Sequence, residues 1–297
     1  MAIIDRLLAP GSGFQKNFFF LAKRFVAGET IGSAIEAVRS LNAAGMTATL
    51  DFLGEDVLER DAAIATREAY IAMLERIRET GVQSNVSVKM SAMGLLIDDG
   101  FALDNLTRIL HFAQRNADPF VRIDMEGSAV TQITLDLFER AYAQDKNVGI
   151  VLQAYLKRTP SDVARMIELG ARVRLCKGAY SEPAEIALKE MPEIRRQYVS
   201  LAKDLLDRGN YPAIATHDRE LIDEIRTYVR ERGIARDRFE FQMLYGIRPQ
   251  LQRELVADGY RLRIYVPYGT HWAGYFFRRV MERRENAIFA LSSMWSK

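Results

Sequence analysis

Two adjacent arginines near the carboxyl end of the chain belong to a group of residues that could form a binding or catalytic site. A β-rich run precedes them, Thr270 is a good residue to cap a helix start, and the helix expected after it carries Tyr275, Arg278, Arg279 and Glu282. At about 100° per residue these four side chains fall within an arc of roughly 100°. Adjacent guanidiniums can hold a carboxylate or phosphate through forked hydrogen bonds, and a glutamate one turn away can orient them. The alternative is a solvated helix face that carries Arg–Glu pairs.

Polar side chains also recur where short, apolar, β-type runs end. Burial in a core would favour apolar residues at such positions, so a repeated polar residue there indicates a site. Gly178 and Ala179 stand beside one of these residues, which indicates that the backbone there approaches another group closely. The polar residues are Asp51, Glu55, Lys89, Asp124, Gln153, Tyr155, Arg174, Lys177, Thr216, His217, Gln242 and Tyr265.

Some of these residues also have purely structural interpretations. Lys89 and Asp124 are compatible with a structural ion pair near the mouth of a barrel. His217 is compatible with a hydrogen-bonded histidine of the core, and Lys177 with a surface lysine in a loop. The chain has three histidines and one cysteine, no cluster of them has the spacing of a zinc site, and no metal is expected.

Eight β-type runs alternate with longer amphipathic segments, and these elements must position the polar residues. The runs are 47–53, 85–90, 120–125, 149–154, 172–176, 213–216, 238–243 and 261–266. Helices are expected at 14–26, 30–44, 59–79, 103–116, 132–144, 160–168, 185–207, 220–232 and 249–258. This alternation predicts an α/β fold, a distorted (β/α)8 barrel of the TIM type with N-terminal helices, whose site lies at the carboxyl ends of the strands. A doubly wound open sheet is the runner-up, although no Gly-x-Gly-x-x-Gly follows the first run.

Length and composition fit one such barrel. The chain has 297 residues, of which 48% are hydrophobic and 27% are charged. No linker or low-complexity segment interrupts it, so a single domain is predicted over 1–297, with a helical prelude at 1–45 and the barrel at 46–290. The net charge of +2 and the absence of a basic stripe argue against a nucleic-acid partner.

The single cysteine fits a reducing, cytoplasmic location. No run approaches the ~18 apolar residues that a bilayer-spanning helix needs. The apolar and basic segment 17–26 is expected to pack against its own domain, and contact with a membrane surface is the alternative.

Seven short motifs follow one another along the chain, each at the end of an expected strand or on the last helix. They are Ser87-Val-Lys89-Met-Ser, Ile123-Asp124-Met125-Glu126, Gln153-Ala-Tyr155, Arg174-Leu-Cys-Lys177-Gly178-Ala179-Tyr180, Ala215-Thr216-His217, Phe241-Gln242-Met-Leu-Tyr245-Gly246 and Tyr275-x-x-Arg278-Arg279-x-x-Glu282. In this order they resemble the motifs of proline dehydrogenases, over a stretch from about residue 47 to residue 282. The resemblance implies a monofunctional bacterial enzyme that uses FAD to oxidise L-proline to 1-pyrroline-5-carboxylate. That reaction is the first step of proline catabolism to glutamate, and the electrons pass to a quinone.

On the substrate side, the resemblance assigns Arg278 and Arg279 to the carboxylate of proline. Lys89 and Glu282 complete the charge environment, and Tyr265 is expected to pack against the ring. Proline is a small zwitterion, so its pocket needs cations for the carboxylate and an apolar wall for the ring. No dedicated base is evident, and holding the carboxylate serves mainly to position the reacting carbon.

On the catalytic and flavin side, the resemblance places Asp124 beside Lys89 and Arg174 near the flavin ring. A cation there favours the negative charge of the reduced flavin. Glu55 resembles an acid that pairs with Arg174 as a gate over bound substrate. The implied flavin contacts are Met125, Gln153, Arg174, Lys177, Gly178, Ala179, Thr216 and His217.

The resemblance also implies partners, and alternatives to it stay open. The implied partners are a quinone, a membrane surface contacted transiently, and a separate pyrroline-5-carboxylate dehydrogenase that takes the product. Ser181 and Tyr268 depart from the residues expected at their positions. The alternatives are a flavin barrel that reduces another small substrate, a non-catalytic flavin or amino-acid sensor, and an aldolase-type barrel with Lys89 or Lys177 as Schiff-base nucleophile.

Overall fold

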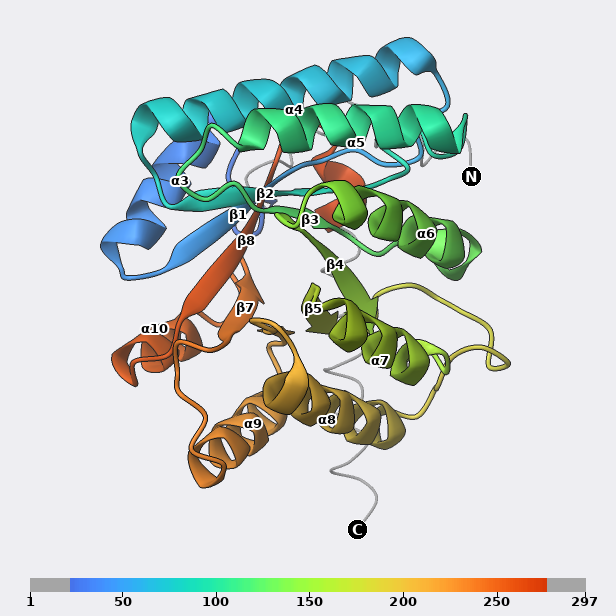
Figure 1. The fold of residues 1–297 in the computed structure, drawn as a ribbon. Coiled ribbons are helices and arrows are strands. Elements are labelled where there is room, and N and C mark those ends of the chain that lie inside the picture. The colour runs from blue at the N-terminus through green and yellow to red at the C-terminus, as the bar shows by residue number, and fades with distance from the viewer. Residues whose placement is uncertain (1–21, 277–297) are drawn as a thin grey trace.

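Eight parallel strands close into a barrel in the computed structural model, which describes residues 22–276 (Figure 1). The strands follow sequence order around the barrel: β1 (Thr47–Phe52), β2 (Ser84–Val88), β3 (Val121–Ile123), β4 (Val148–Gln153), β5 (Arg172–Cys176), β6 (Ala213–Ala215), β7 (Glu240–Leu244) and β8 (Leu262–Tyr268). β8 pairs with β1, from Arg263 opposite Thr47 to Tyr268 opposite Phe52, and this pairing closes the sheet. The predicted (β/α)8 barrel is confirmed, and the open doubly wound sheet is excluded.

Helices surround the barrel on its outside (Figure 1). α3 leads into β1, and the others connect successive strands: α4 (Arg60–Thr80), α5 (Asp99–Ala113), α6 (Ser128–Gln144), α7 (Thr159–Leu169), α8 (Met191–Arg208), α9 (Arg219–Glu231) and α10 (Pro249–Ala257), with α3 at Ile31–Ala43. The sequence of α4 shows why such a helix packs against the barrel. Its buried residues recur three, four and seven positions apart and form one apolar stripe. The main hydrophobic core fills the layer between the helices and the outward faces of the strands.

The expected helices are largely confirmed, with one clear correction and two that extend beyond the described residues. The helix expected at 185–207 begins only at Met191, because the segment before it forms turns and a bridge between Leu156 and Ala187. Pro192 lies in the first turn of α8, where its missing N–H costs nothing. The helix expected at 14–26 and the one that carries the arginine pair lie mostly outside the described residues. The domain bounds 1–45 and 46–290 stay predictions.

Polar side chains occupy much of the barrel interior. Arg174 of β5 donates hydrogen bonds to Asp124, just after β3, and to Gln242 of β7. These strands are not neighbours in the sheet, so such bonds span the inside of the barrel. TIM barrels are usually filled by branched apolar residues, and a polar filling requires a partner for each group. The other buried polar residues of this interior include Thr49, Asn85, Ser87, Arg122, Glu240 and Arg263.

The first described residues pack against the end of β8. The Ala27 N–H donates to the Pro267 carbonyl at 2.9 Å, and the Gly269 N–H donates to the Gly28 carbonyl at 3.0 Å. Phe25 is buried in a small second cluster with Trp272 and other residues. For this part of the 17–26 segment, packing against its own domain is confirmed. Within 22–276, no helix has the length and apolar character that crossing a bilayer requires.

Candidate active site

Two buried ion pairs lie at the carboxyl ends of the strands. Lys89 Nζ is 2.9 Å from Asp51 Oδ1, and Arg174 Nη1 is 2.7 Å from Asp124 Oδ1. The Tyr265 hydroxyl donates to the second oxygen of Asp124 at 2.7 Å. Segments far apart in the sequence thus bring four predicted site residues together at one mouth of the barrel. The structural ion pair considered for Lys89 is corrected in one respect, since its partner is Asp51 and not Asp124.

The surroundings of these groups set their protonation states. Burial alone would lower the pKa of Lys89, but the negative charges of Asp51 and Asp124 raise it above its usual value. Burial, together with the charges of Asp124 and Asp51, raises the pKa of Tyr265 well above that of an ordinary phenol. Lys89 is therefore a permanent cation and Tyr265 a neutral hydrogen-bond donor. A Schiff-base nucleophile must be a neutral amine, so the arrangement argues against the aldolase-type alternative for Lys89.

Arg174 keeps one nitrogen for a ligand. Its Nε donates to Gln242 Oε1, and its Nη1 donates to Asp124 and, at 3.3 Å, to the Ser87 hydroxyl. The Nη2 atom is buried and has no hydrogen-bond partner among the described residues. A buried guanidinium N–H without an acceptor is unfavourable, so the position fits an electron-rich ligand such as a flavin ring edge.

A close backbone approach follows β5, at the residues predicted to contact the cofactor. Gly178 has φ +129°, and a Cβ there would lie 2.2 Å from the ring of Tyr155. The Ala179 N–H donates to Gln153 Oε1 at 3.3 Å, and Gln153 Nε2 donates to the Glu126 carbonyl at 3.0 Å. The amide of Gln153 thus ties the 178–179 loop to the segment after β3. Packing against Tyr155 thus requires a glycine at position 178, and contact of these residues with a flavin stays a prediction.

The remaining predicted flavin contacts are held by their neighbours. Lys177 Nζ lies 3.1 Å from Asp218 Oδ2, so Lys177 is not a free surface lysine. The Thr216 hydroxyl accepts from the Asp218 N–H at 3.1 Å. His217 Nε2 accepts from the Leu244 N–H at 2.8 Å and ties the end of β6 to β7. That bond agrees with the structural interpretation of His217, and its contact with flavin stays a prediction.

Other predicted site residues are only partly placed. Arg278, Arg279 and Glu282 lie outside the described residues, so the carboxylate-binding helix stays a prediction. Met125 is buried, two residues after the end of β3. Glu55 is half-buried in the segment after β1, and its charge acts on Lys89. The ion-pair partner of Arg174 is Asp124, and the pairing of Glu55 with Arg174 as a gate stays a prediction.

Sequence reasoning missed several residues that hold the site. Asp51 and Gln242 are among the polar residues at or near strand ends, but the sequence predicts no role for them. Ser87 Oγ donates to Asp124 Oδ1 at 2.6 Å, and the Tyr70 hydroxyl donates to the Ser87 carbonyl at 2.7 Å. Ser87 could have been found from its spacing, because it stands two residues before Lys89 in the expected strand and the two side chains therefore point to the same face. Nothing in the sequence marks Tyr70, which reaches in from α4.

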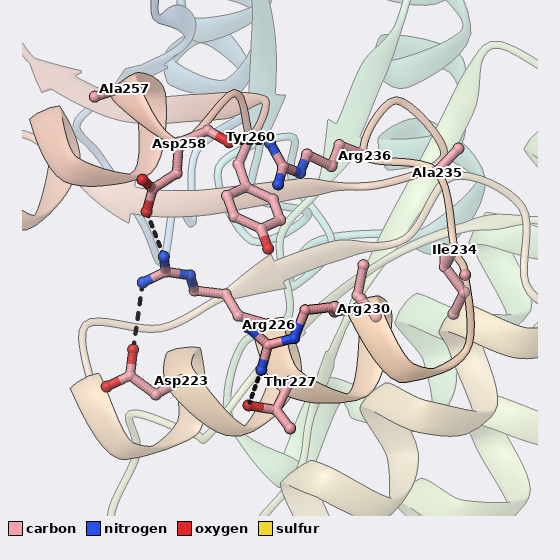
Figure 2. A pocket seen from close by; sticks show the side chains of 12 residues that line it. Asp223, Arg226, Thr227, Arg230, Ile234, Ala235, Arg236, Ala257, Asp258 and Tyr260 are labelled. Carbon is pink, nitrogen blue, oxygen red and sulfur yellow. Dashed lines mark hydrogen bonds and ion pairs between the residues drawn. The ribbon is translucent and has the colours of Figure 1, made fainter.

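The pocket in Figure 2 lies at the opposite end of the barrel. It has a volume of about 810 Å³ and is formed by the end of α9 and the segments that lead into β7 and β8. Arg226 lies between Asp223 and Asp258, and Arg236 and Arg226 flank the Tyr260 ring. None of the predicted site residues lines it, and its arginines are largely engaged with neighbouring groups. The polar cluster at the carboxyl ends of the strands therefore remains the candidate site, and its role stays a prediction.

Comparison with known proteins identifies the family of the chain. A family model described as Proline dehydrogenase matches residues 34–291. The chain belongs to the proline dehydrogenase family. It is an oxidoreductase of that activity, and membership of the family implies proline as substrate and a flavin as cofactor. The buried Nη2 of Arg174, which has no partner among the described residues, fits that cofactor.

Individual relatives match over most of the chain. Proline dehydrogenase 1 of Bacillus subtilis subsp. natto is 41% identical over 276 residues, which are 93% of this chain and 91% of the relative. A proline dehydrogenase of Deinococcus radiodurans is 39% identical over 285 residues, which are 94% of this chain and 92% of that relative. A crystal structure of proline utilization A from Bdellovibrio bacteriovorus, inactivated by N-propargylglycine, superposes with a TM-score of 0.84 at 27% identity. The match covers 90% of this chain and 33% of that larger one.

Proposed function

We propose that this chain oxidises L-proline to 1-pyrroline-5-carboxylate with FAD as its cofactor and a quinone as electron acceptor. This reaction would be the first step of proline catabolism to glutamate, and a separate pyrroline-5-carboxylate dehydrogenase would take the product. The observation that carries the proposal is the buried cluster of Lys89, Asp124, Arg174 and Tyr265, in which Arg174 keeps one nitrogen unpartnered. Family membership supplies the reaction class.

The residues of the chain have separable tasks in this proposal. Arg278, Arg279 and Lys89 would hold the carboxylate of proline, since adjacent guanidiniums form forked bonds and Lys89 is a permanent cation. Tyr265 is locked by its bond to Asp124 and would present its ring to the apolar side of proline. Holding a small substrate at both its charged and its apolar side orients the carbon that reacts.

The cofactor side of the site would use the groups that follow β4, β5 and β6. When bound, a flavin supplies a two-electron acceptor for the hydride that proline loses. Arg174 would place positive charge where the reduced cofactor carries negative charge. Gln153, Lys177, Gly178, Ala179, Thr216 and His217 would hold the cofactor, together with the backbone at Met125.

The first experiment is to mix the purified protein with L-proline in the absence of oxygen and to record the visible spectrum. We expect a flavin band that proline bleaches. Arg278→Met or Arg279→Met is expected to slow this bleaching by about 10²-fold, because each removes a forked bond to the carboxylate. Arg284→Met removes the same charge from the opposite face of the expected helix and serves as the matched control, with little change expected.

The same sample tests the finer parts of the proposal. Mass spectrometry of the released cofactor distinguishes FAD from FMN, and o-aminobenzaldehyde traps 1-pyrroline-5-carboxylate as a coloured adduct. Re-oxidation of the reduced protein by a short-chain quinone, faster than by oxygen, supports the acceptor. A yellow protein that proline does not bleach would favour the reductase or sensor alternatives. Irreversible bleaching by N-propargylglycine would support a site like that of the Bdellovibrio protein.

A further inference from the structure

The side-chain amide of Gln242 joins two charged groups inside the barrel. Its Nε2 donates to Glu240 Oε1 at 2.5 Å, and its Oε1 accepts from Arg174 Nε. Glu240, Gln242 and Arg174 are all buried, with 2%, 4% and 6% of their surfaces exposed. Bulk water therefore cannot replace the bond from Gln242 to Glu240 or the bond from Arg174 to Gln242, and both must be made within the protein.

The two neighbours of Gln242 dictate which way its amide points. An ionised carboxylate only accepts hydrogen bonds, and a guanidinium only donates them. Glu240 therefore requires the NH₂ group of Gln242, and Arg174 requires its oxygen. Rotating the amide by half a turn would set two acceptors face to face at Glu240 and two donors face to face at Arg174. The carboxylate of Glu240 thus selects the orientation in which Gln242 can accept from Arg174.

Glu240 is held as a carboxylate from the amino end of the barrel. Arg263 Nε donates to both of its oxygens, at 3.0 and 3.2 Å, and the Tyr211 hydroxyl donates to Oε2 at 3.3 Å. Arg263 is itself anchored by a bond of 2.7 Å from Nη1 to the Ala48 carbonyl. Burial alone would raise the pKa of Glu240, but the charge of Arg263 and the hydrogen bonds it receives bring it below its usual value. Glu240 is therefore ionised throughout the neutral pH range.

The strand between Arg174 and Gln242 leaves room for this contact. β6 lies between β5 and β7, and its Ala213 pairs with Arg174 on one side and with Glu240 on the other. Ala215 pairs with Gln242. Paired residues point to the same side of a sheet, so the inward positions of β6 carry only methyl groups. A long side chain on β5 can therefore cross β6 to reach β7.

We propose that Glu240 is a positioning residue for the active site, which orients the Gln242 amide so that its oxygen holds Arg174 against Asp124. Glu240 touches neither substrate nor cofactor in this proposal and acts only through Gln242. The functional part rests on the proposed function, because it assumes that Arg174 serves the oxidation of proline. The structural part, that Glu240 sets the acceptor of Arg174 Nε, stands independently.

The structural part is tested by NMR of arginine Nε–H groups in the flavin-loaded protein. Arg174→Lys identifies the Arg174 signal by its loss. In Glu240→Gln the amide of residue 242 has no fixed orientation, so the Arg174 signal is expected to shift and to exchange with water about tenfold faster. Tyr211→Phe removes a different bond to the same carboxylate and is expected to leave the signal in place. An unchanged Arg174 signal in Glu240→Gln would overturn the proposal.

The functional part is tested by a double-mutant cycle on kcat/KM for L-proline. Glu240→Gln and Gln242→Met are each expected to lower kcat/KM about tenfold, and Glu240→Gln in the Gln242→Met background is expected to add less than about twofold. Independent losses that multiply would mean that Glu240 acts by another route and would overturn the proposal. If Glu240→Gln does not fold, Glu240→Asp replaces it, because it keeps the charge beside Arg263 but withdraws it from Gln242.

The two readouts separate the two possible failures. A wild-type protein that proline does not reduce would refute the proposed function, while the NMR result would still decide the role of Glu240. A wild-type protein that proline reduces, with an unchanged Arg174 signal in Glu240→Gln, would refute the positioning role alone.

Discussion

Asp124 organises the candidate site at the scale of single residues. Its Oδ1 accepts from Arg174 at 2.7 Å and from Ser87 at 2.6 Å, while its Oδ2 accepts from Tyr265 at 2.7 Å. One carboxylate therefore binds the guanidinium of Arg174 with one oxygen and the hydroxyl of Tyr265 with the other. The Arg174 guanidinium also lies 5.3 Å from the centre of the Tyr265 ring, which ties these two side chains directly.

Asp124→Asn is expected to weaken both folding and catalysis. The substitution leaves Arg174 buried without a counter-ion and turns one acceptor into a donor, so the free energy of unfolding is expected to fall by about 3 kcal/mol. Bleaching by proline is expected to slow by about 10²-fold, because both Arg174 and Tyr265 lose their anchor. Urea unfolding and anaerobic stopped flow measure the two effects.

The control for this prediction is Asp104→Asn, which breaks an ion pair with Arg108 on the surface of α5. Both partners of that pair are more than half exposed, so less than about 1 kcal/mol is expected. Equal stability losses in Asp124→Asn and Asp104→Asn would contradict the view that Asp124 neutralises a buried cation.

The sequence predicted which residues gather at the site better than it predicted their partners. Lys89, Asp124, Arg174 and Tyr265 are identified because each stands at or near the end of an expected strand, and strand ends meet in a barrel. The partner of Lys89 proved to be Asp51, since side-chain pairing depends on the register between strands and on the reach of each side chain across the barrel. Neither quantity can be obtained from the spacing of residues along one chain.

At the scale of elements, the start of α9 connects a helix end to the site. Asp218 caps the helix by accepting from the Glu220 N–H at 3.2 Å. Its Oδ2 also lies 3.1 Å from Lys177 Nζ and 2.9 Å from Arg195 Nε. Burial alone would raise the pKa of Asp218, but these two cations bring it below its usual value. The charge of Asp218 thus holds Lys177, a predicted cofactor contact, to the start of α9.

Asp218→Asn is expected to cost stability in a way that depends on pH. Asparagine caps a helix about as well as aspartate, so the substitution removes mainly the charge. Because the pKa of Asp218 is lower in the folded than in the unfolded chain, its stabilisation is complete above the unfolded value near 3.8 and is lost as the pH falls through the folded value. The variant is therefore expected to be about 1 kcal/mol less stable near neutral pH.

This difference is expected to vanish once the pH falls below the lowered pKa of Asp218 in the folded protein, where both proteins are uncharged at this position. Urea unfolding of both proteins across this pH range measures it. A difference that persists at low pH would mean that Asp218 acts through its shape as a cap and not through its charge.

Element types could be predicted from sequence, whereas some boundaries could not. The eight β-type runs all form strands, because alternating short apolar and longer amphipathic segments have few other solutions. The start of α8 was placed too early, since Glu185–Glu190 reads as helical but contributes to a bridge with the segment after β4. Tertiary pairing overrode local propensity at this position.

At the scale of the whole molecule, the connection from β7 to α10 packs directly against the amino-terminal segment around Arg24. Gly246 has φ +70°, and a Cβ there would lie 1.6 Å from the Arg24 carbonyl oxygen. The same segment is tied to β8 by the bond from Ala27 to Pro267. The first described residues therefore pack at the carboxyl ends of β7 and β8, at the same end of the barrel as the candidate site. The apolar character of residues 17–26 predicts packing against the domain, but it does not identify the partner, because the contact joins positions more than two hundred residues apart.

Gly246→Ala is expected to release this amino-terminal segment from the barrel. An alanine at that φ costs about 1–2 kcal/mol in any environment, and here its methyl group must also displace the Arg24 backbone. Gly233→Ala is the matched control, because Gly233 has φ +64° and nothing within 4 Å of the added Cβ. The control is expected to lose only the backbone contribution, so Gly246→Ala should be the less stable by about 2 kcal/mol or more. Hydrogen exchange at the Ala27 N–H should accelerate only in Gly246→Ala, and equal exchange in both variants would mean that the segment and the barrel are not energetically connected.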